Sequence, residues 1–154
     1  MAEGVNCVHH VVWCIKPESM APVRALWEEA LGLELQDLDL PDLGIHVMIS
    51  WEGGIEIMAP TYDEGSLVQS ARDFLEQKGE GVYSVVYNVE NLASAVAKYS
   101  AHGATLAFQE DIGTDDVDDR QLSDDASGGF AIKQALFDEM FGMRICLQEL
   151  SKER

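Results

Sequence analysis

Two similar stretches, VHHVVWCI at residues 8–15 and VYSVVYNV at residues 82–89, decide the fold of this chain. Both are short and rich in β-branched and aromatic residues, which is typical of buried strands. When residue 8 is aligned with residue 82, the stretches share three identical and two closely similar positions. Val-rich strands often match by chance, so the order of elements that follows each stretch is the stronger evidence for a duplicated unit.

One helix and three strands are predicted after each stretch. The first set is a helix over 19–31 that ends at Gly32, then strands over 33–38, 45–51 and 55–58. The second set is a helix over 92–102, then strands over 104–108, 130–137 and 143–150. We therefore predict an α+β fold with two βαβββ modules in a single domain. The expected parts are module 1 at about 5–60, a linker helix within 61–80, module 2 at about 81–150 and an acidic loop over 109–129.

Charge and composition exclude several classes of partner. The 154 residues include 28 acidic and 10 basic side chains, which gives a formal charge of −18. This charge repels nucleic acid and anionic lipid, so neither is an expected partner. The three cysteines lack the CxxC spacing and indicate reduced thiols, and the first residues do not resemble a signal peptide. We expect a cytoplasmic protein without a membrane partner.

Alternation along the predicted strands divides each sheet into an apolar face and a mixed face. The apolar face, which includes Val47 and Tyr87, suits cover by helices. The mixed face includes His10 and suits a cavity for a ligand, although a solvated sheet face would look the same in sequence. The residues expected to line the cavity are Met48, Met58, Ser84, Arg144, Cys146 and Gln148.

With these elements in place, the chain resembles the vicinal oxygen chelate superfamily of glyoxalases, bleomycin-resistance proteins and extradiol dioxygenases. The resemblance rests on HHVVWCI at 9–15, LWEEALGLEL at 26–35, GIEIMAP at 54–60 and FLEQKGEGVYSVVYNVENL at 74–92. It is nearest to the branch of methylmalonyl-CoA epimerase and glyoxalase-like proteins. The resemblance implies two curled mixed sheets around a cavity, with a divalent metal on His, Gln and Glu side chains.

The positions implied by the resemblance are filled only in the first module. The first-strand His falls on His10, and the fourth-strand Glu or Gln falls on Glu56. The matching positions of the second module fall on Ser84 and Cys146, which are not the expected ligands. His46 would substitute as a ligand if it pointed inward. The open alternatives are a divalent ion (Zn, Fe, Ni, Co or Mn) held by His10 and Glu56, and no cofactor at all.

Two functions follow from these residues. The first is a glyoxalase-like lyase, isomerase, epimerase or dioxygenase that acts on a small, partly apolar oxygenated metabolite, with His10 and Glu56 as the catalytic residues. Without metal, the same pair transfers protons, and the carboxylate orients the imidazole. The second is a metal-free protein that binds and sequesters a small molecule in the manner of bleomycin-resistance proteins. The resemblance also implies a homodimer.

Overall fold

The computed structural model describes residues 4–112 and 130–152. The chain forms two compact units, one spanning His10–Tyr83 and the other combining residues 4–9 with the chain from Ser84 onward. The strands are β1 (Cys7–Cys14), β2 (Gln36–Leu40), β3 (Ile45–Ser50), β4 (Ile55–Pro60), β5 (Gly81–Asn88), β6 (Leu106–Ile112), β7 (Phe130–Phe137) and β8 (Ile145–Lys152). The helices are the short 3-10 turn η1 (Pro17–Ser19), then α1 (Met20–Leu31), α2 (Val68–Lys78) and α3 (Leu92–Ala101). The predicted α+β fold with two βαβββ modules is confirmed.

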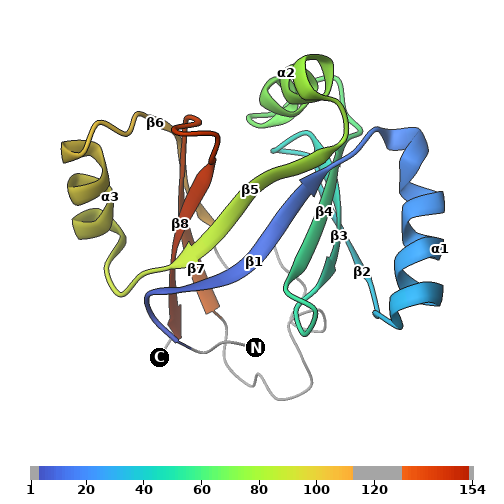
Figure 1. Cartoon of the computed structure of the whole chain (residues 1–154), viewed down its shortest axis with the longest axis horizontal. Helices are drawn as coiled ribbons and strands as arrows, with labels where there is room; N and C mark the ends of the chain where they lie inside the picture. Colours follow the sequence, from blue (N-terminus) through green and yellow to red (C-terminus); the bar gives the residue numbers. More distant parts are fainter. Residues whose placement is uncertain (1–3, 113–129, 153–154) are drawn as a thin grey trace. The chain divides into compact units, whose positions relative to one another are not determined.

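In the first unit, α1 covers one face of a four-stranded mixed sheet (Figure 1). The strand order is β2-β3-β4-β1, with β1 and β4 parallel and the other pairs antiparallel. On this face, Ile15, Met48 and Ile57 are buried and pack with Val23 and Trp27. Gly32 ends α1 in the left-handed conformation at φ 67°, as its predicted position after the helix requires.

The opposite face of this sheet is covered by α2 at one end. Val68, Ala71 and Phe74 of α2 are buried, and the thiol of Cys14 donates to the carbonyl oxygen of Ala71 over 3.8 Å. The backbone amide of Leu67 donates to the carbonyl of Leu43 over 3.0 Å. Helix α2 is therefore fixed over the end of this face where β1 terminates.

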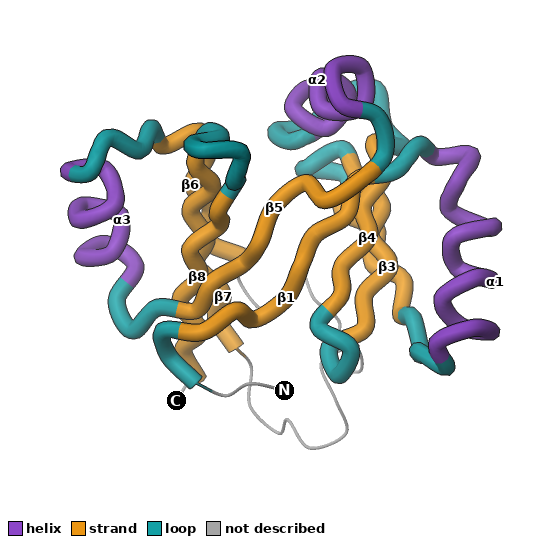
Figure 2. Tube along the Cα trace, viewed as in Figure 1, coloured by secondary structure: helices purple, strands orange, loops and turns teal. Residues whose placement is uncertain are grey.

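The second unit repeats the arrangement with α3 on one face of its sheet (Figure 2). Its strands lie in the order β6-β7-β8-β5. Leu92, Phe137 and Leu147 are buried in its core, and Tyr99 stacks edge-on against Phe137 at 4.7 Å between ring centroids. Asn91 begins α3 by accepting a hydrogen bond from the amide of Ser94, which satisfies one of the free amides of the first turn.

Two predictions from the sequence are wrong in detail. The acidic loop does not start at residue 109, because β6 continues to Ile112 and pairs with β7. Asp111 lies opposite Lys133 in that ladder, and an opposite-charge pair supports a strand. The rest of the predicted loop, 113–129, lies outside the described residues. In β3 the helix-facing side is the one that carries His46 and Met48, not the side of Val47.

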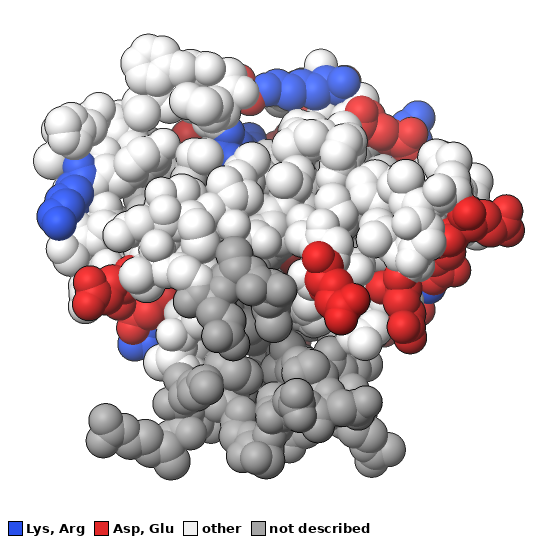
Figure 3. Space-filling view, turned by 60° about the horizontal axis from the view of Figure 1, so that its bottom comes forward, with Lys and Arg blue, Asp and Glu red and all other residues white. Residues whose placement is uncertain are grey.

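Charged side chains are scattered over the face shown in Figure 3, where Lys and Arg do not gather into a basic patch. No helix in the described part of the chain is both long enough and apolar enough to cross a membrane.

Glu80 ties the start of β5 to the turn before α1. Its carboxylate accepts a hydrogen bond from the backbone amide of Lys16 over 2.9 Å. A hydrogen bond from the Ser19 side chain, followed by the one from Lys16, lowers the pKa of Glu80 below its ordinary value. Because the pKa of Glu80 is lower in the folded state, the ionised carboxylate stabilises the fold at pH values above its ordinary pKa. This stabilisation is lost as pH falls through the lowered pKa.

Replacing Ser19 with Ala should therefore raise the pKa of Glu80 toward its ordinary value. Carboxyl titration followed by NMR measures this pKa directly. Ser66→Ala, which removes a hydroxyl from a different loop, is the control and should leave Glu80 unchanged. If Glu80 titrates at the same pH in the Ser19→Ala variant and the wild type, Ser19 does not hold this carboxylate.

Candidate functional site

His10 and Glu56 meet on the face of the first sheet that α1 does not cover. The parallel register of β1 and β4 places Glu56 opposite Val12. His10 is two residues before Val12 in β1, so its side chain lies on the same face as Glu56. His10 Nε2 and Glu56 Oε2 are 3.0 Å apart. The imidazole is buried, with 3% of it exposed, whereas 20% of the Glu56 side chain is exposed. The carboxylate is thus the member of the pair that a ligand can reach.

The turn between β3 and β4 supports the pair. Trp51 meets the His10 ring edge-on, at 6.0 Å between centroids and an interplanar angle of 85°. The carbonyl of Gly54 accepts from the amide of Val11 over 2.9 Å, which attaches the turn to β1 beside His10. Gly54 has a φ of 65°, a conformation that glycine adopts without strain. The imidazole is therefore held between a fixed turn and its carboxylate partner.

Gln36 of β2 is a second polar residue in the same cross-strand row as Glu56. The register pairs Glu56 with Ile49 and Ile49 with Gln36, so all three side chains lie on one face. Sequence reasoning missed Gln36, because the predicted strand over 33–38 had no register. The available signal was the alternation QDLDL at 36–40, in which Gln36 takes the place of a leucine.

Met58 also lies on the face of Glu56, opposite Val47 and beside Cys14. Met48 does not, because it pairs with Ile57 and packs on the α1 face. The prediction that Met48 and Met58 line one cavity is therefore wrong. Both faces of β3 are buried, so alternation of polarity could not identify the face that meets the helix.

The second unit holds Ser84 and Cys146 in the positions that correspond to His10 and Glu56. Cys146 lies opposite Val86 in the β5–β8 register, as Glu56 lies opposite Val12. Ser84 precedes Val86 by two residues, as His10 precedes Val12. Both side chains are buried, with 4% of Ser84 and 6% of Cys146 exposed. These positions therefore provide a hydroxyl and a thiol, not an imidazole and a carboxylate.

Gln148 shares the face of Cys146 and belongs to a buried row of amides. Its Nε2 donates to Asn88 Oδ1 over 3.1 Å, and its Oε1 accepts from Gln134 Nε2 over 2.7 Å. Asn88 in turn donates to the carbonyl of Gly4 over 3.4 Å. Because both ends of its side-chain amide are engaged, Gln148 is a structural member of this sheet.

Arg144, just before β8, and Glu149, within β8, have different surroundings. Arg144 immediately precedes β8 and is half-buried, and its carbonyl accepts from the amide of Val85 over 3.0 Å. Glu149 faces α3, where its Oε2 accepts from the amide of Leu92 over 2.7 Å. A carboxylate at a helix N-terminus is favoured by the helix dipole. Glu149 is thus on the helix-facing side of β8.

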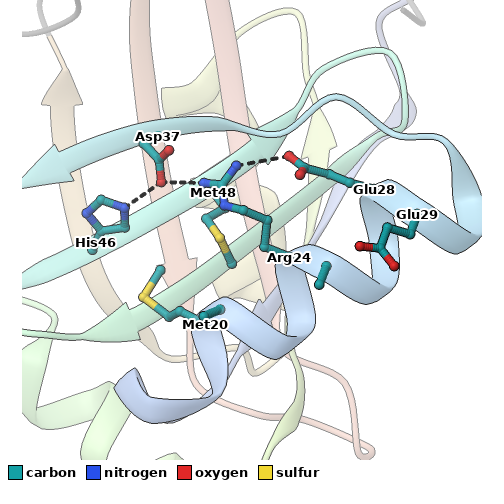
Figure 4. A pocket seen from close by; sticks show the side chains of 9 residues that line it. Met20, Arg24, Glu28, Glu29, Asp37, His46 and Met48 are labelled. Carbon is teal, nitrogen blue, oxygen red and sulfur yellow. Dashed lines mark hydrogen bonds and ion pairs between the residues drawn. The ribbon is translucent and has the colours of Figure 1, made fainter.

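An open pocket of about 420 Å³ lies on the α1 face of the first unit (Figure 4). Its polar groups bind one another: Asp37 contacts His46 at 2.8 Å and Arg24 at 2.6 Å, and Arg24 also contacts Glu28 at 3.0 Å. Asp39 lies 3.5 Å from the other ring nitrogen of His46. The alternative in which His46 points toward Glu56 is therefore wrong, because aspartates at the sheet edge hold it on the opposite face.

The donor atoms of His10 and Glu56 are only part of what a divalent metal requires. Two ligand atoms about 2.1 Å from one ion lie roughly 3.0–3.4 Å apart, so the spacing of His10 and Glu56 would accommodate an ion. Two protein ligands do not complete such a site. Within residues 4–112 and 130–152, no group of three or more His, Cys, Asp or Glu side chains is arranged to hold a metal. The described residues therefore do not fit a resident divalent metal.

The two βαβββ units, with a polar pair on the uncovered face of the first, define a glyoxalase-type α+β protein. A family model described as the "Glyoxalase/Bleomycin resistance protein/Dioxygenase superfamily" matches residues 9–120. This match spans more than half of the chain, so the chain belongs to that superfamily. Among the curated proteins, none matches this chain in sequence.

Solved structures show the same fold at low sequence identity. A hypothetical protein from Bacillus halodurans C-125 has a TM-score of 0.66 at 18% identity, covering 96% of this chain and 95% of that chain. A methylmalonyl-CoA epimerase variant from Streptomyces coelicolor, in complex with 2-nitronate-propionyl-CoA, has a TM-score of 0.64 at 13% identity, with 95% and 98% covered. A variant of 4-hydroxymandelate synthase from the same organism has a TM-score of 0.65 at 13% identity, with 96% of this chain and 49% of that chain covered.

Proposed function

We propose that the chain is an enzyme that transfers a proton at a carbon atom beside neighbouring oxygens in a small, partly apolar metabolite. The observation that carries this proposal is the contact between His10 Nε2 and Glu56 Oε2 at 3.0 Å, with the imidazole buried and the carboxylate accessible. A carboxylate within reach of an acidic C–H is a general base, and such a group accelerates a reaction by about 10²–10⁴-fold. An epimerase inverts a stereocentre, which requires removal of a proton from one face of the carbon and return of a proton to the other face.

Glu56 and His10 have different roles in this proposal. The carboxylate of Glu56 takes the proton from carbon, and the electrons of the C–H bond move to the neighbouring carbonyl to form an enolate. The carboxylic acid then returns a proton to the same face of the carbon, and in an epimerase the enolate turns over relative to Glu56 before the proton returns. His10 is the positioning residue: its ring, held against Trp51, fixes the orientation of the carboxylate toward the reacting carbon.

Deuterium exchange tests this proposal without knowledge of the full reaction. The chain is incubated in D₂O with 2-oxo acids, 2-hydroxy ketones and 2-methylacyl thioesters, and label at the carbon beside the carbonyl is followed by NMR. We expect enzyme-dependent exchange for at least one class. His10→Gln should reduce this rate at least about tenfold, because it removes the ring that Trp51 holds against the Glu56 carboxylate and so leaves the base misplaced.

The control is His102→Gln, which alters an exposed histidine at the end of α3 and should leave exchange unchanged. Exchange that survives His10→Gln undiminished would remove His10 from the mechanism. If the wild type exchanges none of the compounds, the chain is not a proton-transfer enzyme of this kind.

The second candidate is a binding protein that sequesters a small molecule in the manner of bleomycin-resistance proteins. The observation that favours it is the absence of an imidazole or carboxylate at Ser84 and Cys146, which correspond to His10 and Glu56. In that case a ligand would bind without turnover, and its affinity would be insensitive to His10→Gln.

We also infer that the chain forms a homodimer and acts in the cytoplasm on a small-molecule ligand. Family resemblance supports the dimer, and the lack of a CxxC pair among the three cysteines supports a reducing compartment. Light scattering coupled to size exclusion should give twice the mass of one chain.

A further inference from the structure

Helix α1 carries apolar side chains on its outward side as well as on the side that meets the sheet (Figure 1). Val23 and Trp27 pack on the sheet, yet no residue of α1 is buried. On the outward side, Pro22, Leu26 and Ala30 follow one another at intervals of four residues and are exposed, with 61% of Leu26 accessible. A helix covered on one side only normally carries polar residues on the other. The outward side of α1 is therefore an apolar face without a cover.

Helix α2 of the same unit provides the comparison. Its inward residues are buried, and its exposed positions are all polar: Gln69, Arg72, Asp73, Glu76, Gln77 and Lys78. In α1 the exposed positions hold alanine, proline and leucine, and Glu29 is the one charged residue among them. Water favours the composition of α2, whereas a protein surface favours that of α1. This contrast indicates that another protein surface covers the outward side of α1.

The apolar face is complementary to itself in an antiparallel pair of α1 helices. If two copies meet around a two-fold axis at Leu26, the two equivalent leucines contact each other, and Pro22 lies beside Ala30 of the partner subunit. Side chains spaced by four residues form the ridge that is used in the commonest class of helix packing. The smaller residues at both ends of this ridge leave room for the leucines at its centre.

Charge favours a second copy in this antiparallel orientation. The formal charge of −18 makes copies of the chain repel one another, and a face whose only charged residue is Glu29 reduces that repulsion. In the antiparallel pair, Glu29 lies beside the first turn of the partner's α1, where the positive end of the helix dipole attracts a carboxylate. In a parallel pair the two copies of Glu29 would face each other. The antiparallel pair is therefore the favoured one.

The pocket beside α1 extends this surface beyond the helix (Figure 4). Ala21 and Ala25 line the pocket and are also exposed, so the apolar face and the pocket share an edge. Met20 and Met48 line the same pocket, and methionine side chains adapt to the surface that packs on them. A second copy on the apolar face can therefore also contact this side of the pocket.

We propose that the outward face of α1, centred on Leu26, is the contact between two copies of this chain, with the two α1 helices antiparallel around a two-fold axis. This inference deepens the homodimer inferred above and rests on it for the second copy. It does not depend on His10 or Glu56, which lie on the face of the first sheet that α1 does not cover. Proton transfer and this contact can therefore be tested separately.

Sedimentation of the full chain at a series of concentrations measures the dissociation constant of the dimer. Leu26→Glu should raise this constant at least about 100-fold, because two like charges replace two apolar side chains at the axis. Leu31→Glu is the matched control: Leu31 is on the same helix and is 62% exposed, against 61% for Leu26. It lies five residues later, about 140° around the helix, and its substitution should leave the dissociation constant unchanged. Far-UV circular dichroism checks that each variant is folded.

A mixing experiment tests the two-fold geometry. Leu26→Lys alone should weaken the dimer as Leu26→Glu does, because two lysines then face each other. An equimolar mixture of Leu26→Glu and Leu26→Lys should recover a particle of twice the mass of one chain. In that heterodimer an acidic and a basic side chain meet at the axis.

Each contrary result has a distinct meaning. A wild type that stays monomeric overturns both this inference and the homodimer. A dimer that survives Leu26→Glu, or that Leu31→Glu weakens equally, overturns the contact through α1 and leaves the homodimer with another surface. Folded Leu26→Glu and Leu26→Lys variants that stay monomeric when mixed overturn the meeting of the two leucines at the axis.

Discussion

Replacing Glu56 with Gln should lower the rate of enzyme-dependent deuterium exchange by about 10²–10⁴-fold, the usual contribution of a general base. The substitution keeps the size of the side chain and an oxygen near His10 Nε2, but it removes the group that accepts the proton. The rate of exchange in D₂O, followed by NMR at saturating substrate, measures the loss. Substrate affinity should change little, because the carboxylate is proposed to act on the transferred proton.

The matched control is Glu52→Gln, four residues earlier in the turn between β3 and β4. Glu52 is exposed and carries the same charge, so the control reports any effect of net charge at this edge of the sheet. Exchange at the wild-type rate in Glu56→Gln would contradict the assignment of Glu56 as the base. A comparable loss in Glu52→Gln would point to the charge of the whole turn.

Replacing Gly65 with Ala should destabilise the fold by about 3 kcal/mol or more. Gly65 has a φ of 148°, and a Cβ there would overlap backbone atoms of Leu43 and Gly44. A hydrogen bond joins the same two segments, because the backbone amide of Ser66 donates to the carbonyl of Asp42 over 3.1 Å. Backbone atoms cannot move aside as the end of a flexible side chain can. To make room for the added Cβ, the loop before α2 must therefore move away from the turn before β3.

Gly79→Ala is the matched control for the conformational part of this cost. Gly79 also has a positive φ, of 79°, but a Cβ there meets no atom within 4 Å. Its ψ is −166°, which puts it in a region that essentially only glycine adopts, so its cost should be about 1–3 kcal/mol. Urea unfolding of both variants gives the two free energies of unfolding. Equal losses would show that the close contact at Gly65 does not fix the position of α2.

The sequence was sufficient to predict the fold because each element carries a strong local signal. The two Val-rich strands, the glycine after α1 and the Glu-Gly-Gly turn each mark a boundary within a few residues. The large residues Trp13, in β1, and Ile15, just after it, lie on one face and identify the helix side correctly. The later end of β6 was missed because acidic residues are poor strand formers by themselves. Their partners in β7, such as Lys133, are distant in sequence.

The sequence predicts a site residue only where the pattern of a single strand is sufficient to identify it. The sequence motifs identify His10 and Glu56, and in the structure His10 Nε2 lies 3.0 Å from Glu56 Oε2. The faces of β3 were assigned wrongly because both are buried, and His46 is a polar residue on the helix side whose partners, Asp37 and Asp39, come from β2. Gln36 required the register of three strands, which local alternation does not contain.

The central claim is that Glu56, positioned by His10, transfers a proton without a resident metal. Metal content and deuterium exchange measured on one preparation, made without a His-tag and treated with a chelator, test it most directly. We predict less than about 0.1 divalent ion per chain, with exchange unchanged by the chelator and abolished in Glu56→Gln. About one ion per chain, lost together with exchange on chelation and in His10→Ala, would contradict the claim and make the pair part of a metal site.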